Sequence, residues 1–221
     1  MDSVNLAIVG SAEPANRFRS WCQAGEVTVT EPADATLVIL APDGDPTAVP
    51  EGCVVAICTT GEAVTPRAAA LPDPSAGVGL HVVPAYSRNT LVEVVAAETT
   101  AQPAVEAVVA LVGRLGLTAV TTRDRPGFLL RRLVLPYLNQ AIAALDDGVA
   151  SGADIDRSVE LGLGYPVGPL RLVDALGLEA HHAATTAVAG ELADPHFVPP
   201  ALLTRKIAAG LGFHDHQETL T

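Results

Sequence analysis

The chain has 221 residues, of which 49% are hydrophobic and 17% charged, so it is long enough to bury a substantial core. No apolar run approaches the roughly 20 residues of a membrane helix, and no basic segment precedes the first apolar run, so we expect no membrane partner, no signal peptide and a cytoplasmic location. The formal net charge of −12 repels phosphate backbones and anionic lipids, which argues against nucleic acid as a partner.

Residues 1–123 predict a domain in which short strands alternate with helices. Apolar runs of strand length lie at 6–9, 36–40, 53–58, 78–83 and 90–95. Segments 14–25 and 103–116 begin with proline, keep apolar residues at helical spacing and end at glycine, as helices between strands do. This pattern predicts an α/β domain with a mainly parallel sheet.

One connection in this half is too short for a parallel crossover. After the run VTVT at 27–30, only the residues EPADA precede the strand at 36–40, whereas a crossover between parallel neighbours takes roughly a dozen residues or more. Segment 27–30 is therefore a stub, or it pairs antiparallel with 36–40. In both cases we expect an abbreviated, Rossmann-like sheet.

Residues 124–221 predict a second, all-α domain. Long amphipathic segments lie at 128–148, 151–164, 169–193 and 199–210. Ser151 and Asp154 are candidate N-caps of the second segment. Helix stops are expected at Gly148, Gly162, Gly164 and Gly177. The change from a period of two to a period of 3.6 places the domain boundary near residue 123.

The cysteines and histidines give little sign of a metal site. Cys22, Cys53 and Cys58 are odd in number and lack a CxxC pair, so buried thiols are favoured over a disulfide or metal site. His181 and His182 are adjacent on a predicted helix and point apart, and the histidines at 214 and 216 lie in the tail. We therefore predict no metal.

The residues after the first predicted strand have the spacing of a dinucleotide-binding loop. In a GxGxxG loop the first glycine makes the turn, the second admits the pyrophosphate, and the third lets the helix pack closely on the strand. Here these positions hold Gly10, Ala12 and Ala15, so a methyl group stands where the phosphate approaches. Glu31 lies about 20 residues on, where an acidic residue binds ribose hydroxyls. The loop indicates NAD as cofactor and leaves its loss open.

Segment 124–179 carries a specific combination of motifs. In chain order these are Pro126-Gly127-Phe128, the run LPYLNQA, Asp154-Ile155-Asp156, GYPVGP and Asp174. The segment resembles the helical domain of the 3-hydroxyacyl-CoA dehydrogenase family, and the resemblance extends from about residue 35 to 209. It implies a homodimer formed through the helical domain, which closes over an acyl-CoA.

The upstream segment LHVVPAYSRNTLVEVV looks like the part of that family that carries its catalytic histidine and glutamate. His81 and Glu93 stand at the matching positions. The resemblance implies that His81 takes the proton of the 3-hydroxyl as hydride leaves for the nicotinamide, and that Glu93 stabilises the imidazolium. A strand histidine near a carboxylate on the next strand is a base that titrates near neutrality. Spacing alone leaves a core histidine with a surface glutamate as the alternative.

Two further positions complete the predicted site. Thr60 keeps a hydroxyl where a family serine contacts substrate. Arg131 replaces a family asparagine with a permanent cation, which crowds the oxidised nicotinamide or binds an anionic group. The helical hairpin that follows the second strand in the family, and supplies basic contacts to CoA, is absent from the sequence.

Two functions are open at this point. The first is an NAD-dependent oxidoreductase of fatty acid metabolism that oxidises a 3-hydroxyacyl-CoA, or a smaller 3-hydroxy acid, to the 3-keto product. The second is a catalytically impaired relative that acts as a dimeric binding or scaffold protein without cofactor. The retained His81 and Glu93 favour the first, and the altered loop with the missing hairpin favours the second.

Overall fold

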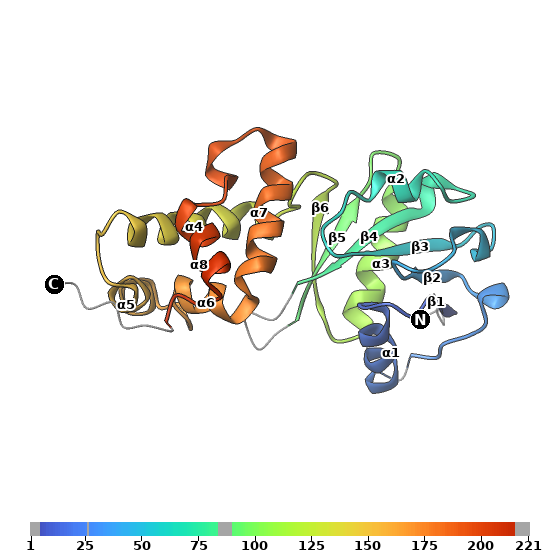
Figure 1. Cartoon of the computed structure of the whole chain (residues 1–221). Coiled ribbons are helices and arrows are strands. Elements are labelled where there is room, and N and C mark those ends of the chain that lie inside the picture. The colour runs from blue at the N-terminus through green and yellow to red at the C-terminus, as the bar shows by residue number, and fades with distance from the viewer. Residues whose placement is uncertain (1–4, 26, 84–89, 215–221) are drawn as a thin grey trace. The chain divides into compact units, whose positions relative to one another are not determined.

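The computed structural model describes residues 5–25, 27–83 and 90–214, and the chain divides into two compact units, Met1–Phe128 and Leu129–Thr221. The first contains a six-stranded sheet with helices, and the described part of the second is helical (Figure 1). The division follows Phe128 rather than residue 123 because the turn at 124–128 packs on the sheet: Phe128 belongs to its core, and the Asp124 carboxylate accepts hydrogen bonds from Val64 N and Thr65 N.

The strands of the sheet lie side by side in chain order. They are β1 (Leu6–Val9), β2 (Leu37–Leu40), β3 (Val54–Thr59), β4 (Gly77–Val82), β5 (Leu91–Ala96) and β6 (Thr118–Arg123). All neighbours pair parallel except β4 and β5, which pair antiparallel, so the predicted mainly parallel sheet is confirmed. β6 falls outside the five predicted strands because its sequence, TAVTTR, is partly exposed at the sheet edge and forms no apolar run.

Segment 27–30 is a stub. Val29 forms a single parallel bridge with Leu6, and Thr30 N donates to Leu6 O at 2.7 Å. Leu37, the first residue of β2, pairs with Leu6 on the opposite side of β1. The antiparallel pairing of 27–30 with 36–40 is therefore wrong. The chain passes from one side of β1 to the other through the short 3-10 turn η1 (Pro32–Asp34), so no crossover helix is needed.

Alternate residues of the strands belong to two cores, one on each face of the sheet. α1 (Ala15–Ala24) and α3 (Gln102–Arg114) cover one face, where Phe18 and Leu111 join a core with Ile39 and Leu80. On the other face the short helix α2 (Thr65–Ala68) contributes Ala68, and residues outside helices, among them Leu71 and Phe128, complete the core. Two further 3-10 turns, η2 (Pro46–Ala48) and η3 (Pro74–Ala76), connect the strands. The three cysteines are buried free thiols, as predicted.

Over residues 129–214, the helical unit packs five helices around its own core. They are α4 (Leu130–Asp146), α5 (Gly152–Leu163), α6 (Pro169–Leu176), α7 (Leu178–Leu192) and α8 (Ala201–Ala209), with the 3-10 turn η4 (Pro195–Phe197) before α8. Their core includes Leu138, Ile142, Leu170 and Leu203, all fully buried. Within the described part of the chain, no helix has the length and apolarity that a membrane crossing needs.

Ser151, Gly164 and Gly177 are confirmed as helix ends, whereas Asp154 and Gly162 are not. Ser151 is the N-cap of α5, and its hydroxyl accepts from Asp154 N at 3.2 Å. Asp154 lies in the first turn rather than at the N-cap, because its carboxylate receives the Ser151 hydroxyl at 2.7 Å. Gly177, with φ of +89°, separates α6 from α7, and Gly164 ends α5, whereas Gly162 lies inside α5 and is not a stop.

The turn GYPVGP is shaped by a close approach to Asp156. A Cβ on Gly168 would lie 2.2 Å from the Asp156 Cβ, so only glycine fits there. The fully buried Asp156 carboxylate accepts from Leu170 N at 2.8 Å and from Arg171 N at 3.3 Å, which caps the start of α6. The motif is therefore a packing feature of this unit, as its sequence indicates.

A buried polar network joins α4 to α7. Asn139 Nδ2 donates to Thr185 Oγ1 at 2.8 Å, and Thr185 Oγ1 donates to Phe197 O at 2.6 Å. His181 Nε2 lies 2.9 Å from Asn139 Oδ1, while His181 Nδ1 is buried with no hydrogen-bond partner among the described residues. Because Asn139 uses its oxygen as an acceptor here, the proton of neutral His181 is assigned to Nε2.

Candidate active site

His81 and Glu93 form a buried pair on neighbouring strands. They are directly opposite each other in the antiparallel register of β4 and β5, and His81 Nδ1 lies 2.6 Å from Glu93 Oε2. Their side chains are 4% and 1% exposed. Glu93 is therefore not a surface glutamate, and the alternative of a core histidine with a surface glutamate is wrong. Opposed residues of adjacent strands point to the same face, which is why the pair meets.

Two further residues lie beside His81 on this face of the sheet. Thr59, the last residue of β3, is opposite His81 in the parallel register. The Phe128 ring packs with its centroid 5.4 Å from that of the imidazole and is 3% exposed. Phe128 has φ of +47° and follows Gly127 at +76°, so an unusual turn aims the ring at the histidine. Sequence reasoning used the Pro-Gly-Phe motif for the family only and assigned Phe128 no place in the site.

Thr60 lies in the loop after β3, next to this group. Its hydroxyl donates to Glu62 Oε1 at 2.7 Å, and its amide donates to Glu62 Oε2 at 2.9 Å. Burial acts to raise the pKa of Glu62, but the hydrogen bonds from Thr60 and Thr59 outweigh it and lower that pKa to about 2. The Thr60 hydroxyl, which was predicted to contact the substrate, thus donates to the carboxylate of Glu62 in the same loop.

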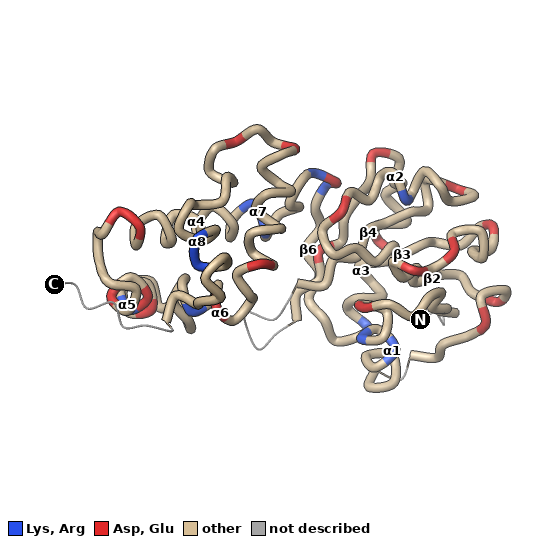
Figure 2. Tube along the Cα trace, viewed as in Figure 1, with Lys and Arg blue, Asp and Glu red and all other residues tan. Residues whose placement is uncertain are grey.

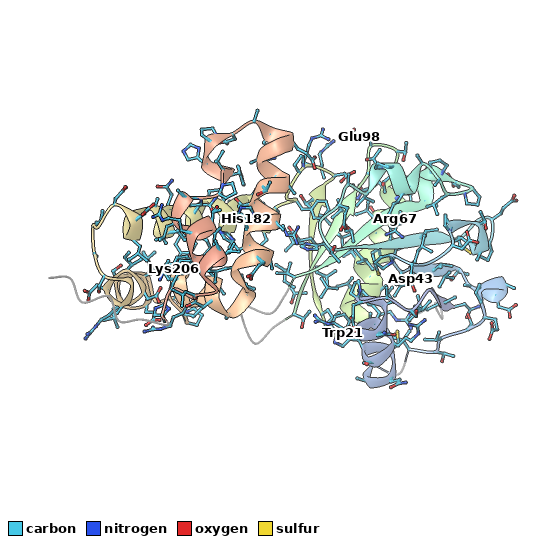
Figure 3. All side chains as sticks on the ribbon, viewed as in Figure 1. Trp21, Asp43, Arg67, Glu98, His182 and Lys206 are labelled. Atoms are coloured by element: carbon cyan, nitrogen blue, oxygen red, sulfur yellow. The ribbon has the colours of Figure 1, made fainter. Side chains whose placement is uncertain are left out.

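A half-buried arginine holds the carboxyl ends of two central strands. Arg67 Nη1 donates to Cys58 O at 2.5 Å, and Arg67 Nη2 donates to Ala41 O at 2.8 Å (Figure 3). Sequence reasoning missed Arg67 because it belongs to a single-turn helix with no motif. Its position at this edge matters because ligands of open α/β sheets bind at the carboxyl ends of the strands.

The loop after β1 turns at Gly10. Its φ of +95° favours glycine, and a Cβ there would lie 2.6 Å from Asp43 Oδ1 and 2.7 Å from the Ala41 Cβ. Ala15, at the third glycine position, begins α1 and is fully buried, so its methyl group is accommodated. Glu31 is exposed and directly follows the stub beside β1.

The amides that follow Gly10 bind a carboxylate of the chain itself. Ser11 N donates to Asp43 Oδ1 and Oδ2 at 3.0 Å, Ala12 N donates to Oδ1 at 2.9 Å, and the Ser11 hydroxyl donates to Oδ2 at 2.8 Å. The Ala12 amide first, then the Ser11 hydroxyl and amide, lower the pKa of Asp43 to about 2. Sequence reasoning missed Asp43. The sign that could have revealed it is an aspartate next to a glycine in the turn after β2, the strand that pairs with β1.

The contacts to the Asp43 carboxylate show which donors the loop offers to an anion such as the phosphates of a dinucleotide. Two adjacent amides and a hydroxyl converge on one anion at the start of α1, which is the donor set that a pyrophosphate uses. Ala12 contributes its amide despite its methyl group. The residues present therefore fit a phosphate-bearing cofactor, with Asp43 standing in for the phosphate.

Arg131 is the second residue of α4 and belongs to the helical unit. Its contact with substrate stays a prediction. Basic residues are outnumbered in this chain, with 13 Lys and Arg against 25 Asp and Glu. The basic residues are scattered over both units (Figure 2).

Fold and site together define a Rossmann-like α/β protein with a buried histidine–glutamate pair and a separate helical unit. The model of the 3-hydroxyacyl-CoA dehydrogenase NAD-binding domain matches residues 46–125, and that of the C-terminal domain matches 127–219. The chain belongs to the 3-hydroxyacyl-CoA dehydrogenase family.

Individual relatives agree with this assignment. A probable 3-hydroxybutyryl-CoA dehydrogenase of Bacillus subtilis is 32% identical over 76% of this chain and 61% of its own length. A 3-hydroxybutyryl-CoA dehydrogenase of Mycobacterium tuberculosis is 35% identical over 71% of this chain and 55% of its own length. The crystal structure of M. tuberculosis FadB2 is 26% identical with a TM-score of 0.79, covering 97% of this chain and 100% of that chain. The chain thus spans about three fifths of the length of the curated relatives it matches.

Proposed function

We propose that this chain is an NAD-dependent oxidoreductase that converts a short 3-hydroxyacyl-CoA, or a smaller 3-hydroxy acid, to the 3-keto product. The observation that carries the proposal is the buried His81–Glu93 pair, 2.6 Å apart and opposed on β4 and β5. The 3-hydroxybutyryl-CoA named for the relatives indicates the substrate class. The chain acts, in this proposal, in cytoplasmic fatty acid metabolism.

The pair sets up proton removal. Glu93 accepts the hydrogen bond of His81 Nδ1–H, which fixes the tautomer in which Nε2 carries the lone pair. In oxidation the O–H bond of the 3-hydroxyl breaks and its proton passes to Nε2. Bound NAD would supply the acceptor for the hydride that leaves C3. The charge on the resulting imidazolium is offset by the Glu93 carboxylate, and the Phe128 ring keeps the imidazole away from water on one side.

The loop after β1 supplies the cofactor site in this proposal. Gly10 makes the turn, the Ser11 and Ala12 amides bind phosphate oxygens, and Glu31 binds the ribose hydroxyls. Thr60 and Arg131 contact the substrate, which for Thr60 requires its hydroxyl to leave Glu62.

The helical unit is proposed to form a homodimer. Large apolar side chains of this unit are exposed to water although its core is well packed, and a second copy is the partner that the family resemblance implies. They are Leu129, Leu133, Val149, Leu161, Leu163, Tyr165 and Val198.

A second candidate function has a specific observation in its favour. Asp43 already satisfies the donors that a pyrophosphate needs, which is the arrangement expected of a relative that binds no cofactor and serves as a dimeric binding or scaffold protein.

The two candidates are separated by activity. Acetoacetyl-CoA reduction is followed by NADH absorbance in the full chain, in His81→Gln and, as a control, in His196→Gln, whose side chain is exposed. We expect His81→Gln to lower kcat by roughly two to four orders of magnitude, the usual effect of losing a general base, with the control unchanged. A wild-type rate in His81→Gln refutes the assigned base, and no turnover by the wild type at millimolar NADH favours the second candidate.

A further inference from the structure

We propose that Asp43 holds the cofactor loop in a self-bound state and that a phosphate-bearing cofactor binds only by displacing this carboxylate, so that Asp43 determines cofactor affinity. This inference rests on the proposed function, because it concerns the same loop.

The contacts make the competition direct. A carboxylate and a phosphate are both anions, and both require the N–H groups of Ser11 and Ala12, which each have a single hydrogen to donate. The Ser11 hydroxyl is directed to the same carboxylate. Two anions cannot share these donors, because their like charges repel at hydrogen-bonding separation.

The rest of the loop is arranged to keep its amides on Asp43. Arg19 Nη2 donates to Gly10 O at 2.5 Å and Asn16 Nδ2 donates to Ser11 O at 2.8 Å, so the carbonyls of the loop are bound on the α1 side. The amides of the same peptide units consequently face the opposite direction, toward Asp43. The loop is therefore formed before any ligand arrives.

Asp43 itself is carried on a tight turn that packs against this loop. Gly44 N donates to Ala41 O at 3.0 Å, and Arg67 Nη2 donates to the same carbonyl. A Cβ on Gly44 would lie 2.7 Å from Val9 O, so the turn sits directly on the end of β1. Figure 3 labels Asp43 and Arg67 in this region of the first unit.

Displacement is nevertheless feasible, because Asp43 is exposed. On leaving the amides its side chain enters water, where an ionised carboxylate is well solvated. The hydrogen bonds that hold Asp43 also keep its pKa near 2, so it competes as a full anion throughout the neutral range. A reversible block at the phosphate position, rather than a permanent loss of the loop, is what these features describe.

The test compares NADH affinity among variants of the full chain by fluorescence titration. We expect Asp43→Ala to lower the Kd for NADH by about tenfold or more. The apparent Kd equals the intrinsic Kd divided by the fraction of molecules whose loop donors are free, and removal of the carboxylate raises that fraction. Asp43→Asn, which keeps an acceptor oxygen but no charge, changes Kd in the same direction by less and serves if the alanine variant is poorly folded. Asp45→Asn is the matched control, since the Asp45 carboxylate bonds only Thr47 among described residues, and its Kd stays as in the wild type. An unchanged or higher Kd for NADH in both Asp43 variants overturns the inference.

A second probe separates this inference from the proposed function. Inorganic pyrophosphate is titrated into ¹⁵N-labelled protein while the amide signals of Ser11 and Ala12 are followed. We expect these signals to shift at lower pyrophosphate concentration in Asp43→Ala than in the wild type. If they do so while no variant binds NADH, the dehydrogenase proposal fails and the role of Asp43 stands; if they respond to pyrophosphate in no variant, or equally in all, the role of Asp43 is refuted.

Discussion

Replacing His181 with glutamine is expected to remove an acid-dependent loss of stability from the helical unit. Burial first, and then the nearby His182, lower the pKa of His181 from 6.5 to about 4. The geometry explains the direction, because protonation would place a hydrogen on the buried Nδ1, which has no acceptor among the described residues. Glutamine does not titrate and retains an N–H to donate to Asn139 Oδ1, which His181 Nε2 now contacts at 2.9 Å.

The magnitude follows from the pKa shift. As pH falls, the unfolded chain binds a proton on this residue near pH 6.5, whereas the folded chain resists until about pH 4. Unfolding therefore takes up one proton within this window, and the free energy of unfolding decreases by about 1.4 kcal/mol per pH unit. The stability linked to neutral His181 is fully present above pH 6.5. About 3 kcal/mol of it is lost by pH 4, with no further loss from His181 below that pH.

Urea denaturation followed by far-UV circular dichroism at several pH values between 7 and 4 measures this effect. The difference in unfolding free energy between wild type and His181→Gln should change by about 3 kcal/mol across the series, in favour of the variant at low pH. His196→Gln, which removes an exposed histidine, should follow the wild type. Parallel pH curves for His181→Gln and wild type refute the reasoning.

Three further substitutions probe packing and capping. Gly168→Ala places a Cβ 2.2 Å from the Asp156 Cβ, and should lower the unfolding free energy of the helical unit by roughly 2–3 kcal/mol in urea titrations; an unchanged midpoint contradicts the close approach. Phe128→Ala removes a buried ring against His81 and should destabilise the sheet unit by roughly 3–5 kcal/mol and lower kcat, and full retention of both contradicts its place in the site. Ser151→Ala removes the N-cap of α5 and should reduce stability by about 1 kcal/mol, with Ser151→Asp as the variant that restores it.

The elements with a clear period were predictable from sequence, and those set by tertiary contacts were not. Five strands and the helices at 14–25 and 103–116 follow from apolar patterning and terminal proline and glycine. β6 lacked such a signal, because an edge strand needs only half of its side chains buried. The stub at 27–30 left two pairings open, since short connections limit topology without stating which side of β1 the next strand takes.

The candidate site was predictable where it depends on opposed strand residues. His81 and Glu93 share a face because their strands pair antiparallel at that register, which the family resemblance anticipated. Asp43 and Arg67 could not be predicted, because each forms hydrogen bonds with backbone atoms of segments far from it in the chain. Backbone donors and acceptors are present at every residue, so sequence gives no sign of which ones a side chain will reach.

The order of strands across the sheet has a consequence for the loop after β1. His81 and Glu93 lie on the antiparallel pair β4 and β5. The strands β2 and β3 separate this pair from β1, the strand beside the stub. Insertions and deletions beyond β1 thus leave the register of this pair untouched. The loop after β1 can therefore be remodelled without disturbing the contact between His81 and Glu93, because that contact depends only on the pairing of β4 with β5.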